Sequence, residues 1–140
     1  MKIKIKRLHS DAKLPNYAHP GDVGLDLYSL EDHVLAPGES KIFMHGFALE
    51  FPEGFGAFVM DKSSTSKVGI KTFGGVFDAG YRGEYNSHIM NLGKEPFVIT
   101  KGQKVAQLVI LPVTIGQLEE VDELSDSSRG EGGFGSTGTH

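Results

Sequence analysis

Turn-forming residues divide this chain into short segments, which limits it to folds built from short elements. Glycine supplies positive φ and proline a fixed φ, so clusters of such residues reverse the chain at 19–22, 37–39, 52–54, 74–75 and 101–102. Between the clusters lie runs rich in β-forming residues, at 34–36, 42–51, 55–60, 68–71, 85–90, 97–100 and 105–115. No segment longer than about ten residues shows helical periodicity. We therefore expect an all-β domain, a sandwich, barrel or jelly roll with little helix.

The first residues predict a further strand. Lysine and isoleucine alternate over residues 2–6 with a period of two, the pattern of a strand with one face buried and its lysines in water. Lysines along an edge strand also oppose pairing with other chains.

Composition excludes several classes of protein. The chain has 140 residues, which suits a single domain, and its lack of cysteine excludes a disulfide framework and a thiolate metal site. A net charge of −4 argues against binding along a nucleic-acid backbone, which requires an excess of lysine and arginine. No apolar run approaches the roughly 20 residues of a membrane span, and the N-terminus lacks the apolar core of a signal peptide. We expect a cytoplasmic protein with no nucleic-acid or membrane partner.

The C-terminal residues differ from the rest of the chain. Residues 125–138 contain one large apolar side chain, Phe134, among glycine, serine and charged residues. Such a segment cannot form a core and is typical of a disordered linker. Arg129 and Phe134 favour a different interpretation, because a guanidinium binds phosphate and an aromatic ring can stack on a base. A tail of this composition could close over a nucleotide.

Several common motifs do not occur, which leaves four internal stretches that could carry chemistry. The sequence contains no phosphate-binding loop of the Walker type, no Rossmann fingerprint and no Gly-x-Ser-x-Gly, and its histidines lack metal-ligand spacing. Residues 18–27 hold two carboxylates four positions apart, Asp22 and Asp26, in a segment that also suits a loop. Residues 61–67 place hydroxyls and ammonium groups after an apolar run, which suits either an oxyanion cradle or a solvated turn.

The other two stretches combine a carboxylate, an aromatic ring and an amide. Residues 74–85 put Asp78 and Tyr81 three positions apart in what we expect to be a glycine-rich hairpin. Residues 104–108 predict a strand that carries Gln107.

Together with the tail, these stretches resemble the five motifs of the trimeric dUTP pyrophosphatases, the dUTPase family, over residues 18–138. The most specific are V-F-D-x-x-Y-R-G-E at 76–84 and R-G-x-G-G-F-G-S-T-G at 129–138. The resemblance implies a jelly roll or distorted β-barrel of the dUTPase-like (β-clip) type, assembled as a homotrimer. It also implies a β domain over residues 1–124 and a flexible glycine-rich arm over residues 125–140 that closes over the active site.

The resemblance further implies a reaction. The family hydrolyses dUTP to dUMP and pyrophosphate, which limits uracil in DNA and supplies dUMP for thymidylate synthesis, with Mg²⁺ held mainly by the substrate phosphates. Asp78 would activate the water that attacks the α-phosphorus, and Lys62 and Gln107 would be the other catalytic residues. Asp22 and Asp26 would lie near the waters of the metal or anchor the phosphate loop, unless they form a structural ion pair.

Specific residues are implied to bind the nucleotide. Tyr81 would lie flat against the deoxyribose and leave no room for a 2′-hydroxyl. Main-chain groups of residues 72–78 would recognise uracil, and Phe134 would stack on it. The expected substrate-binding residues are Lys62, Ser63, Ser64, Thr72, Gly75, Val76, Phe77, Asp78, Tyr81, Gln107, Arg129, Phe134, Gly135, Ser136 and Thr137. In the family each site uses residues of three subunits.

Departures from the family pattern keep two alternatives open. Lys62 and Lys104 stand where arginine is usual, and the run from Lys62 to Gly69 is one residue shorter than expected. That spacing fits the related dCTP deaminases, but these use a glutamate as proton shuttle where this chain has His88. The other alternative is a non-catalytic jelly roll that senses nucleotides and regulates a partner. If the gene is viral, the expected location is the cytoplasm of the host cell.

Overall fold

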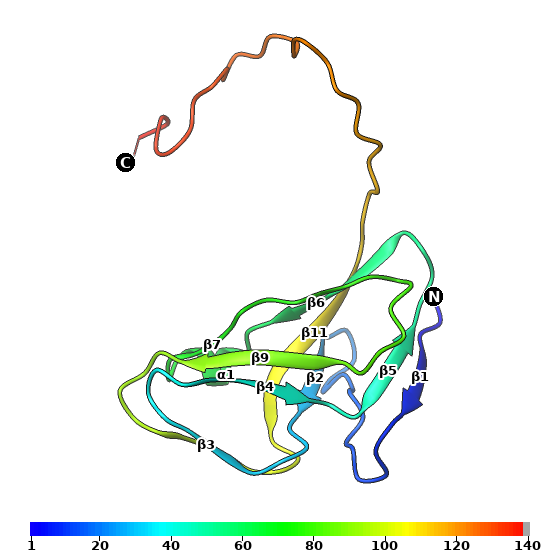
Figure 1. Cartoon of the computed structure of the whole chain (residues 1–140), viewed down its shortest axis with the longest axis vertical. Coiled ribbons are helices and arrows are strands. Elements are labelled where there is room, and N and C mark those ends of the chain that lie inside the picture. Colours follow the sequence, from blue (N-terminus) through cyan, green and yellow to red (C-terminus); the bar gives the residue numbers. More distant parts are fainter. Residues whose placement is uncertain (139–140) are drawn as a thin grey trace.

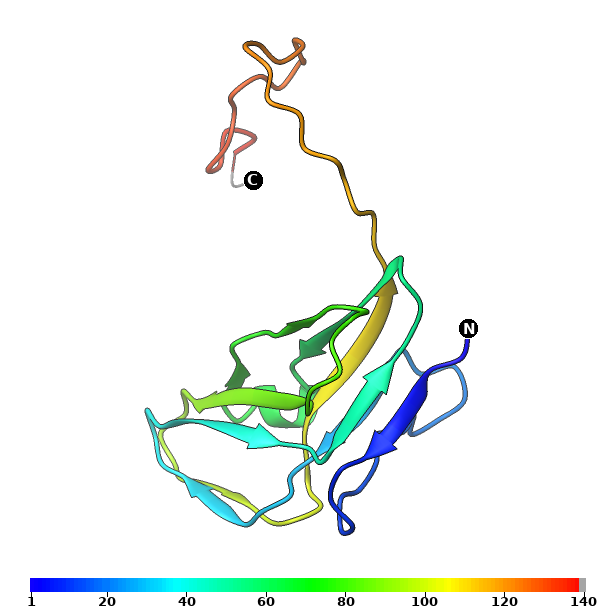
Figure 2. The ribbon, with the colours of Figure 1, turned by 45° about the vertical axis from the view of Figure 1, so that its right-hand side comes forward.

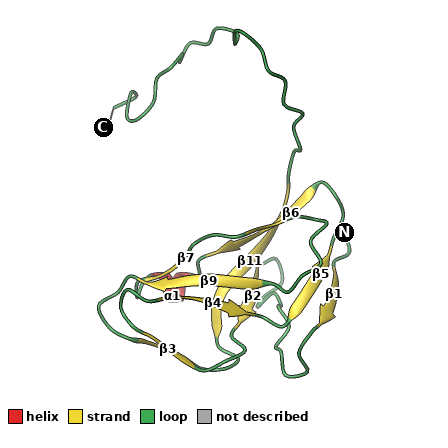
Figure 3. Cartoon of the chain, viewed as in Figure 1, coloured by secondary structure: helices red, strands yellow, loops and turns green. Residues whose placement is uncertain are grey.

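Antiparallel strands form the body of the protein, and the C-terminal segment runs away from it (Figure 1). The computed structural model describes residues 1–138, which contain eleven strands and one short helix, α1 (Ser63–Ser66). Loops and turns make up the rest (Figure 3). The prediction of an all-β protein with little helix is confirmed. In the described range, no helix is long and apolar enough to cross a membrane.

Two sheets contribute to the larger of the two cores. A four-stranded sheet has the order β2-β11-β6-β8 and consists of β2 (Gly24–Tyr28), β11 (Lys104–Pro112), β6 (Phe55–Met60) and β8 (Val76–Phe77). A two-stranded sheet pairs β1 (Lys4–Arg7) with β5 (Phe47–Glu50). The buried side chains are mostly large and apolar: Leu25, Leu27, Phe47, Leu49, Phe51, Ala57, Val59, Phe77, Tyr85, Ala106 and Leu108.

Two further sheets surround the smaller core. One has the order β4-β9-β7 and consists of β4 (Ser40–Met44), β9 (Asn86–Asn91) and β7 (Ile70–Thr72). The other pairs β3 (His33–Leu35) with β10 (Phe97–Ile99). Alternate residues of β9 are buried, as expected for a strand with one face on a core. The buried apolar residues are Leu35, Phe43, Ile70, Ile89, Ile99 and Val105. Short antiparallel strands around these cores make a distorted barrel of the jelly-roll type.

Several predicted strands are wrong in detail, and β2 lies outside all of the predicted runs. Residues 42–51 are not one strand, because Gly46, at a φ of 74°, turns the chain between β4 and β5, which lie in different sheets. β1 begins at Lys4 and not at Lys2, and Ile5 is 40% exposed, so the expected burial of one face is only partial within this chain. β2 was not predicted, because its sequence does not alternate between buried apolar and exposed polar residues: its central residue is a buried aspartate, Asp26.

The C-terminal arm leaves the body at the end of β11. Val113 still donates a backbone hydrogen bond to Gly54, at 2.8 Å, but residues 114–131 are all exposed. Figure 2 shows this segment leading away from the sheets. The extended segment therefore begins before the expected boundary between residues 124 and 125, and the last two residues of the expected arm lie outside the described residues. Closure of the arm over a site stays a prediction.

His45, the buried residue that directly follows β4, contacts both β2 and β9. His45 is 1% exposed, its Nδ1 lies 2.8 Å from the carbonyl oxygen of Tyr28 and its Nε2 lies 2.6 Å from the hydroxyl of Ser87. A neutral ring satisfies both contacts by donating to the carbonyl and accepting from the hydroxyl. Burial lowers the pKa of His45 to about 4.

This low pKa predicts a loss of stability in mild acid. Between pH 6.5 and about 4 the unfolded chain binds a proton at His45 that the folded chain excludes, so the free energy of unfolding falls as the pH falls, by about 3 kcal/mol. Urea unfolding at a fixed protein concentration measures this slope. His45→Gln is expected to flatten it, and His19→Gln, at a side chain 81% exposed, is expected to leave it unchanged. An unchanged slope in His45→Gln contradicts the assignment.

Candidate active site

A cavity of about 410 Å³ opens beside β2 and β11. Three sources of side chains meet there: the loop before β2, the strands β2 and β11, and the residue that precedes α1. We call it the lysine pocket, and its lining residues are Ala18, His19, Asp22, Val23, Gly24, Asp26, Lys62, Lys104 and Gln107.

Asp26 holds both lysines of this pocket. Its carboxylate is 4% exposed; Lys62 Nζ lies 2.5 Å from Oδ1 and Lys104 Nζ lies 2.8 Å from Oδ2. Burial alone raises the pKa of Asp26, but hydrogen bonds from Lys104 and Lys62 outweigh burial and hold this pKa below its ordinary value. The carboxylate stays ionised at neutral pH, and it fixes two ammonium groups in the lining of the pocket. Of the interpretations that the sequence left open for Asp26, an anchor for residues 61–67 and a structural ion pair both match this geometry.

Gln107 depends on a glycine of the neighbouring strand. Gln107 and Asp26 are register partners in the β2–β11 pair, and Gln107 Nε2 donates to the backbone carbonyl of Asp61 at 2.8 Å. A Cβ added at Gly24 would lie 2.1 Å from Oε1 of Gln107, so only glycine leaves room for the amide. The predicted strand that carries Gln107 is confirmed as part of β11.

The polar stretch after β6 folds into one helical turn. Lys62 has extended backbone and precedes α1, while Ser63 and Ser64 are exposed at its start. Asp61 joins the start of this stretch to β7, because its Oδ1 accepts hydrogen bonds from the backbone N–H and the hydroxyl of Thr72 at 2.7 and 2.8 Å. These contacts leave the two serine hydroxyls free to face solvent beside Lys62.

Asp78 lies on a different surface. Its exposed carboxylate borders an apolar groove of about 570 Å³, which we call the Asp78 groove. Its lining residues come from β6 and the turn before it, from β8 and the turn after it, and from the start of the arm: Glu53, Gly54, Phe55, Gly56, Phe58, Val76, Asp78, Ala79, Val113 and Ile115.

The expected hairpin over residues 74–85 is wrong as a pair of strands. β7 pairs with β9, β8 pairs with β6, and β8 is the single strand within these residues. The chain turns directly after β8, and a hydrogen bond from the Tyr81 N–H to the Asp78 carbonyl closes this turn at 3.1 Å. The chain passes from one sheet to another here because Gly74 and Gly75 have φ values of 80° and 143°.

Tyr81 is seated in its loop by three contacts. Its hydroxyl donates to the carbonyl of Glu84 at 3.0 Å, and its ring centroid lies 5.4 Å from that of Phe77 and 5.8 Å from that of Tyr85. A Cβ added at Gly83 would lie 2.4 Å from the Tyr81 hydroxyl, so glycine is needed for the ring to fold back. The ring keeps 38% of its surface exposed.

The loop is fastened to the body next to this ring. Glu84 Oε2 accepts a hydrogen bond from the backbone N–H of Gly46, at 3.0 Å. The bond ties the loop to the turn between β4 and β5.

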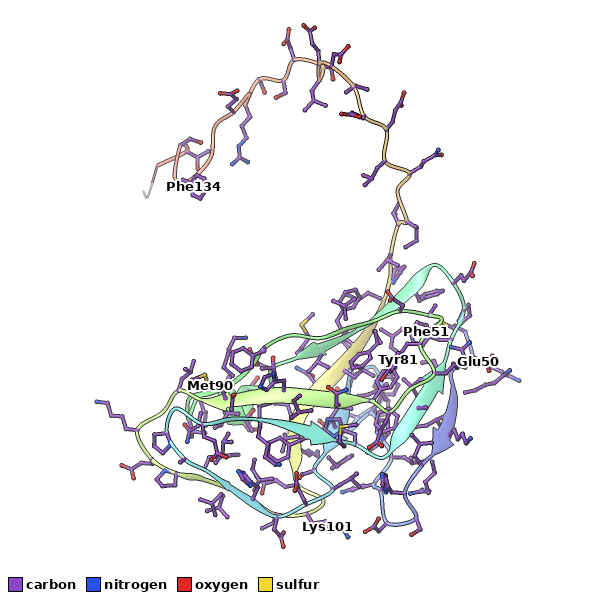
Figure 4. All side chains as sticks on the ribbon, in the orientation of Figure 1. Glu50, Phe51, Tyr81, Met90, Lys101 and Phe134 are labelled. Carbon is purple, nitrogen blue, oxygen red and sulfur yellow. The ribbon has the colours of Figure 1, made fainter. Side chains whose placement is uncertain are left out.

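Within one chain the predicted site residues lie in three places: the lysine pocket, the Asp78 groove with the turn after β8, and the arm. Lys62 and Gln107 line the lysine pocket, Asp78 borders the Asp78 groove, and the two cavities share no lining residue. Phe134 is fully exposed near the end of the arm, far from Tyr81 on the body (Figure 4). In the arm, Arg129 Nε donates to the carbonyl of Gly132 at 2.8 Å.

The residues expected to recognise uracil span the end of β7 to the end of β8, and His88 lies on β9. Thr72 and Phe77 are buried, whereas Gly75 and Val76 are exposed. His88, on β9, packs its ring against Phe73 with the centroids 4.6 Å apart. The strand position that carries a glutamate in deaminases therefore holds a ring in an aromatic contact.

Several functional contacts were not predictable residue by residue. No signal in the sequence predicts the close approach of Gly24 to Gln107, because the two residues lie on different strands. For the same reason it does not predict the hydrogen bonds of Asp61 with Thr72 and of Glu84 with the N–H of Gly46. Lys104 stands out in the sequence as a departure from the family pattern, yet its contact with Asp26 requires the β2–β11 register.

The carboxylates of the lysine pocket differ in how well they suit a magnesium ion. Asp26 has a lysine ammonium beside each of its oxygens, and two cations at this distance oppose the approach of a metal ion. Asp22 keeps its side chain 38% exposed, although Oδ2 accepts a hydrogen bond from the His19 N–H at 2.8 Å. In residues 1–138 no three His, Asp or Glu side chains gather as a metal cluster. Asp22 is thus the carboxylate that fits a site where phosphates supply most of the ligands.

Known proteins share this fold and these motifs. The dUTPase family model matches residues 10–138. The deoxyuridine 5′-triphosphate nucleotidohydrolase of Alkaliphilus metalliredigens is 47% identical over 139 residues, which cover 97% of this chain and 96% of that protein. The chain belongs to the dUTPase family.

Solved structures agree with this assignment. The dUTPase of Staphylococcus bacteriophage 80alpha, solved with dUpNHpp, has a TM-score of 0.89 and 31% identity over 99% of both chains. A mutant dUTPase from phage phi11 of S. aureus has a TM-score of 0.82 and 26% identity over 90% of this chain and all of that chain. That structure is described as showing the coordination of a structural Mg(II) ion.

Proposed function

We propose that this chain hydrolyses dUTP to dUMP and pyrophosphate, which limits uracil in DNA and supplies dUMP for thymidylate synthesis. The observation that carries the proposal is the turn after β8, in a chain of the dUTPase family. This turn presents an exposed carboxylate, Asp78, and an exposed ring face, Tyr81, on one short loop whose base is buried. A carboxylate suits activation of water, and a flat ring suits contact with a sugar.

The proposed chemistry uses groups of this chain at defined atoms. The Asp78 carboxylate accepts a proton from a water whose oxygen attacks the α-phosphorus, and the bond from that phosphorus to the bridging oxygen breaks, so pyrophosphate leaves. Lys62 compensates the charge that develops on the phosphate oxygens, and Asp26 keeps its ammonium in place. Ser63 and Ser64 donate hydroxyl hydrogen bonds to phosphate, and Gln107 adds an amide from β11.

Magnesium is the proposed cofactor. When bound with the substrate phosphates, this ion would supply charge neutralisation during attack on the α-phosphorus. Asp22 is the residue proposed to hold waters of this ion, since it is the carboxylate of the lysine pocket that no lysine occupies. The structural Mg(II) ion described for the phi11 enzyme supports a place for magnesium in the family.

Base and sugar selection is proposed to come from the loop before and after β8. Main-chain groups of Thr72, Gly75, Val76 and Phe77 recognise uracil, and Tyr81 excludes the 2′-hydroxyl of a ribonucleotide. The arm over residues 125–140 is proposed to add the remaining contacts, with the ring of Phe134 on the base and four residues on the phosphates: Arg129, Gly135, Ser136 and Thr137.

We propose a homotrimer with shared active sites. One chain holds Asp78 and the lysine pocket on separate surfaces, so a complete site requires the lysine pocket of one subunit beside the turn of another. Apolar side chains that are more than half exposed, including Ile42, Val76 and Val98, support burial against other copies. A native mass of three chains is expected, and a monomer contradicts the proposal. The proposed location is the cytoplasm, or that of the host if the gene is viral.

A substrate panel tests the function. Purified protein with Mg²⁺ is expected to convert dUTP to dUMP and pyrophosphate while leaving UTP and dTTP largely intact. Ammonia released from dCTP would instead support a deaminase. Tight binding of dUTP without turnover would support the non-catalytic alternative.

A further inference from the structure

A stack of aromatic rings runs from the core to the base of Tyr81. Tyr85, which directly precedes β9, is completely buried. Its ring centroid lies 5.3 Å from that of Phe47 at an interplanar angle of 23°, and 4.2 Å from that of Phe77 at 19°. Its other neighbour is Tyr81, 5.8 Å away and tilted by 58°. Tyr85 and Phe77, which stack on each other, are thus the two core rings that contact the exposed ring of the loop, and Tyr85 is the more deeply buried of them.

The position of Tyr85 is fixed by its backbone. Its N–H donates to the carbonyl of Phe47 at 2.9 Å, and its carbonyl accepts from the N–H of His45 at 3.0 Å. Both bonds join the end of the loop to the β4–β5 turn, where Gly46 also binds Glu84. These bonds fix the backbone from which the ring projects, and the stacked rings of Phe47 and Phe77 confine the ring itself.

Tyr81 has much weaker constraints. Part of the Tyr81 ring faces solvent. Its contacts with the rest of the chain are one hydrogen bond to Glu84 and the rings of Phe77 and Tyr85. A ring excludes a hydroxyl from the space in front of it only when it cannot move backward. Tyr85 occupies part of the space into which the Tyr81 ring would move.

The hydroxyl of Tyr85 contributes little to this packing. It is buried with no hydrogen-bond partner among the described residues, and burial raises the pKa of Tyr85 to about 12. Removal of an unpartnered buried hydroxyl is neutral or favourable for stability. The contact with Tyr81 therefore depends on the aromatic ring, and a phenylalanine can supply it.

We propose that Tyr85 is a specificity-determining residue, which holds Tyr81 against the deoxyribose so that the 2′-hydroxyl of a ribonucleotide does not fit. It acts through Tyr81 and is a positioning residue. This inference rests on the proposed function, in which Tyr81 contacts the sugar.

Three substitutions at Tyr85 test the proposal. Tyr85→Leu and Tyr85→Met remove the ring, and Met limits the cavity because its flexible side chain fills irregular space. Each is expected to lower the ratio of kcat/KM for dUTP over UTP by about tenfold or more, with a rise in KM for dUTP. Tyr85→Phe is expected to keep this ratio within about twofold, because it retains the ring.

A matched control separates selectivity from core damage. Phe43→Leu removes a fully buried ring from the smaller core, so it is expected to lower thermal stability and keep the ratio. Loss of the ratio in Phe43→Leu, or a wild-type ratio in a folded Tyr85→Leu or Tyr85→Met, overturns the proposal. Gly83→Ala would place a Cβ 2.4 Å from the Tyr81 hydroxyl, so the ring must shift, and this variant is expected to lower the ratio without touching the core.

Binding measurements keep this inference distinct from the proposed function. Calorimetry with the non-hydrolysable analogues of dUTP and UTP gives a ratio of Kd values that requires no turnover. If the wild type fails to hydrolyse dUTP but prefers the deoxy analogue, the proposed function fails and the Tyr85 variants still test the inference. If the wild type hydrolyses dUTP and all Tyr85 variants keep the preference, the inference alone fails.

Discussion

Replacement of Asp78 by asparagine is expected to lower kcat for dUTP by about 1,000-fold, with nucleotide affinity retained. Asparagine has the shape of aspartate but cannot accept the proton of the attacking water. The side chain is exposed at the end of β8, so the change is not expected to disturb either core. Steady-state kinetics and calorimetry with a non-hydrolysable dUTP analogue measure the two effects separately.

The control for this variant is a surface aspartate outside both cavities. Asp11 is exposed and forms an ion pair with Lys101, and Asp11→Asn is expected to have wild-type kinetics. Near-normal turnover in Asp78→Asn would show that another group takes the proton. Loss of binding together with turnover would instead assign Asp78 to nucleotide affinity.

Deletion of residues 129–140 is expected to lower kcat/KM by about 100-fold or more while the body and its assembly stay intact. Residues 129–138, the described part of this segment, add no strand to the sheets and no side chain to either core. The expected loss comes from the phosphate and base contacts that orient the substrate, since misplacement of reacting groups costs about 100-fold in rate. Kinetics, together with native mass and thermal unfolding, measure these outcomes.

Point variants in the arm sharpen this experiment. Phe134→Ala removes the ring proposed to stack on the base and is expected to account for much of the loss. Leu124→Ala removes another exposed apolar side chain of the arm, outside the motif, and is expected to be neutral. Wild-type activity in the truncated chain would favour the other interpretation of the tail, a disordered linker without a role in catalysis.

Local patterns in the sequence predicted much of the fold. Glycine and proline clusters mark the turns, and runs of β-forming residues overlap β3, β6, β7, β9, β10 and β11, because these signals act within a few residues. The ends of these runs are less accurate: the run at 105–115 continues three residues past the end of β11. β2 was not predictable in this way. Its buried Asp26 is tolerated because Lys62 and Lys104 neutralise it, and both come from elements distant in the sequence.

Local signals also predicted only part of the candidate site. Motifs identified Asp78, Tyr81 and Lys62 as residues of interest, since their spacing is local. The sequence did not show that Asp78 and Lys62 lie on different surfaces of one chain, nor that residues 74–85 carry one strand and a turn in place of a hairpin. Strand pairing between β8 and β6, and between β7 and β9, sets both features.

The sequence by itself determined the class of fold, the family motifs and the residue types available for chemistry, because short-range backbone preferences and motif spacing are written along the chain. The tertiary structure decided which of these residues meet. Burial of Asp26 brings two lysines to one carboxylate, and the stack through Tyr85 supports Tyr81, because side chains far apart in sequence become neighbours only when the sheets pack around their cores.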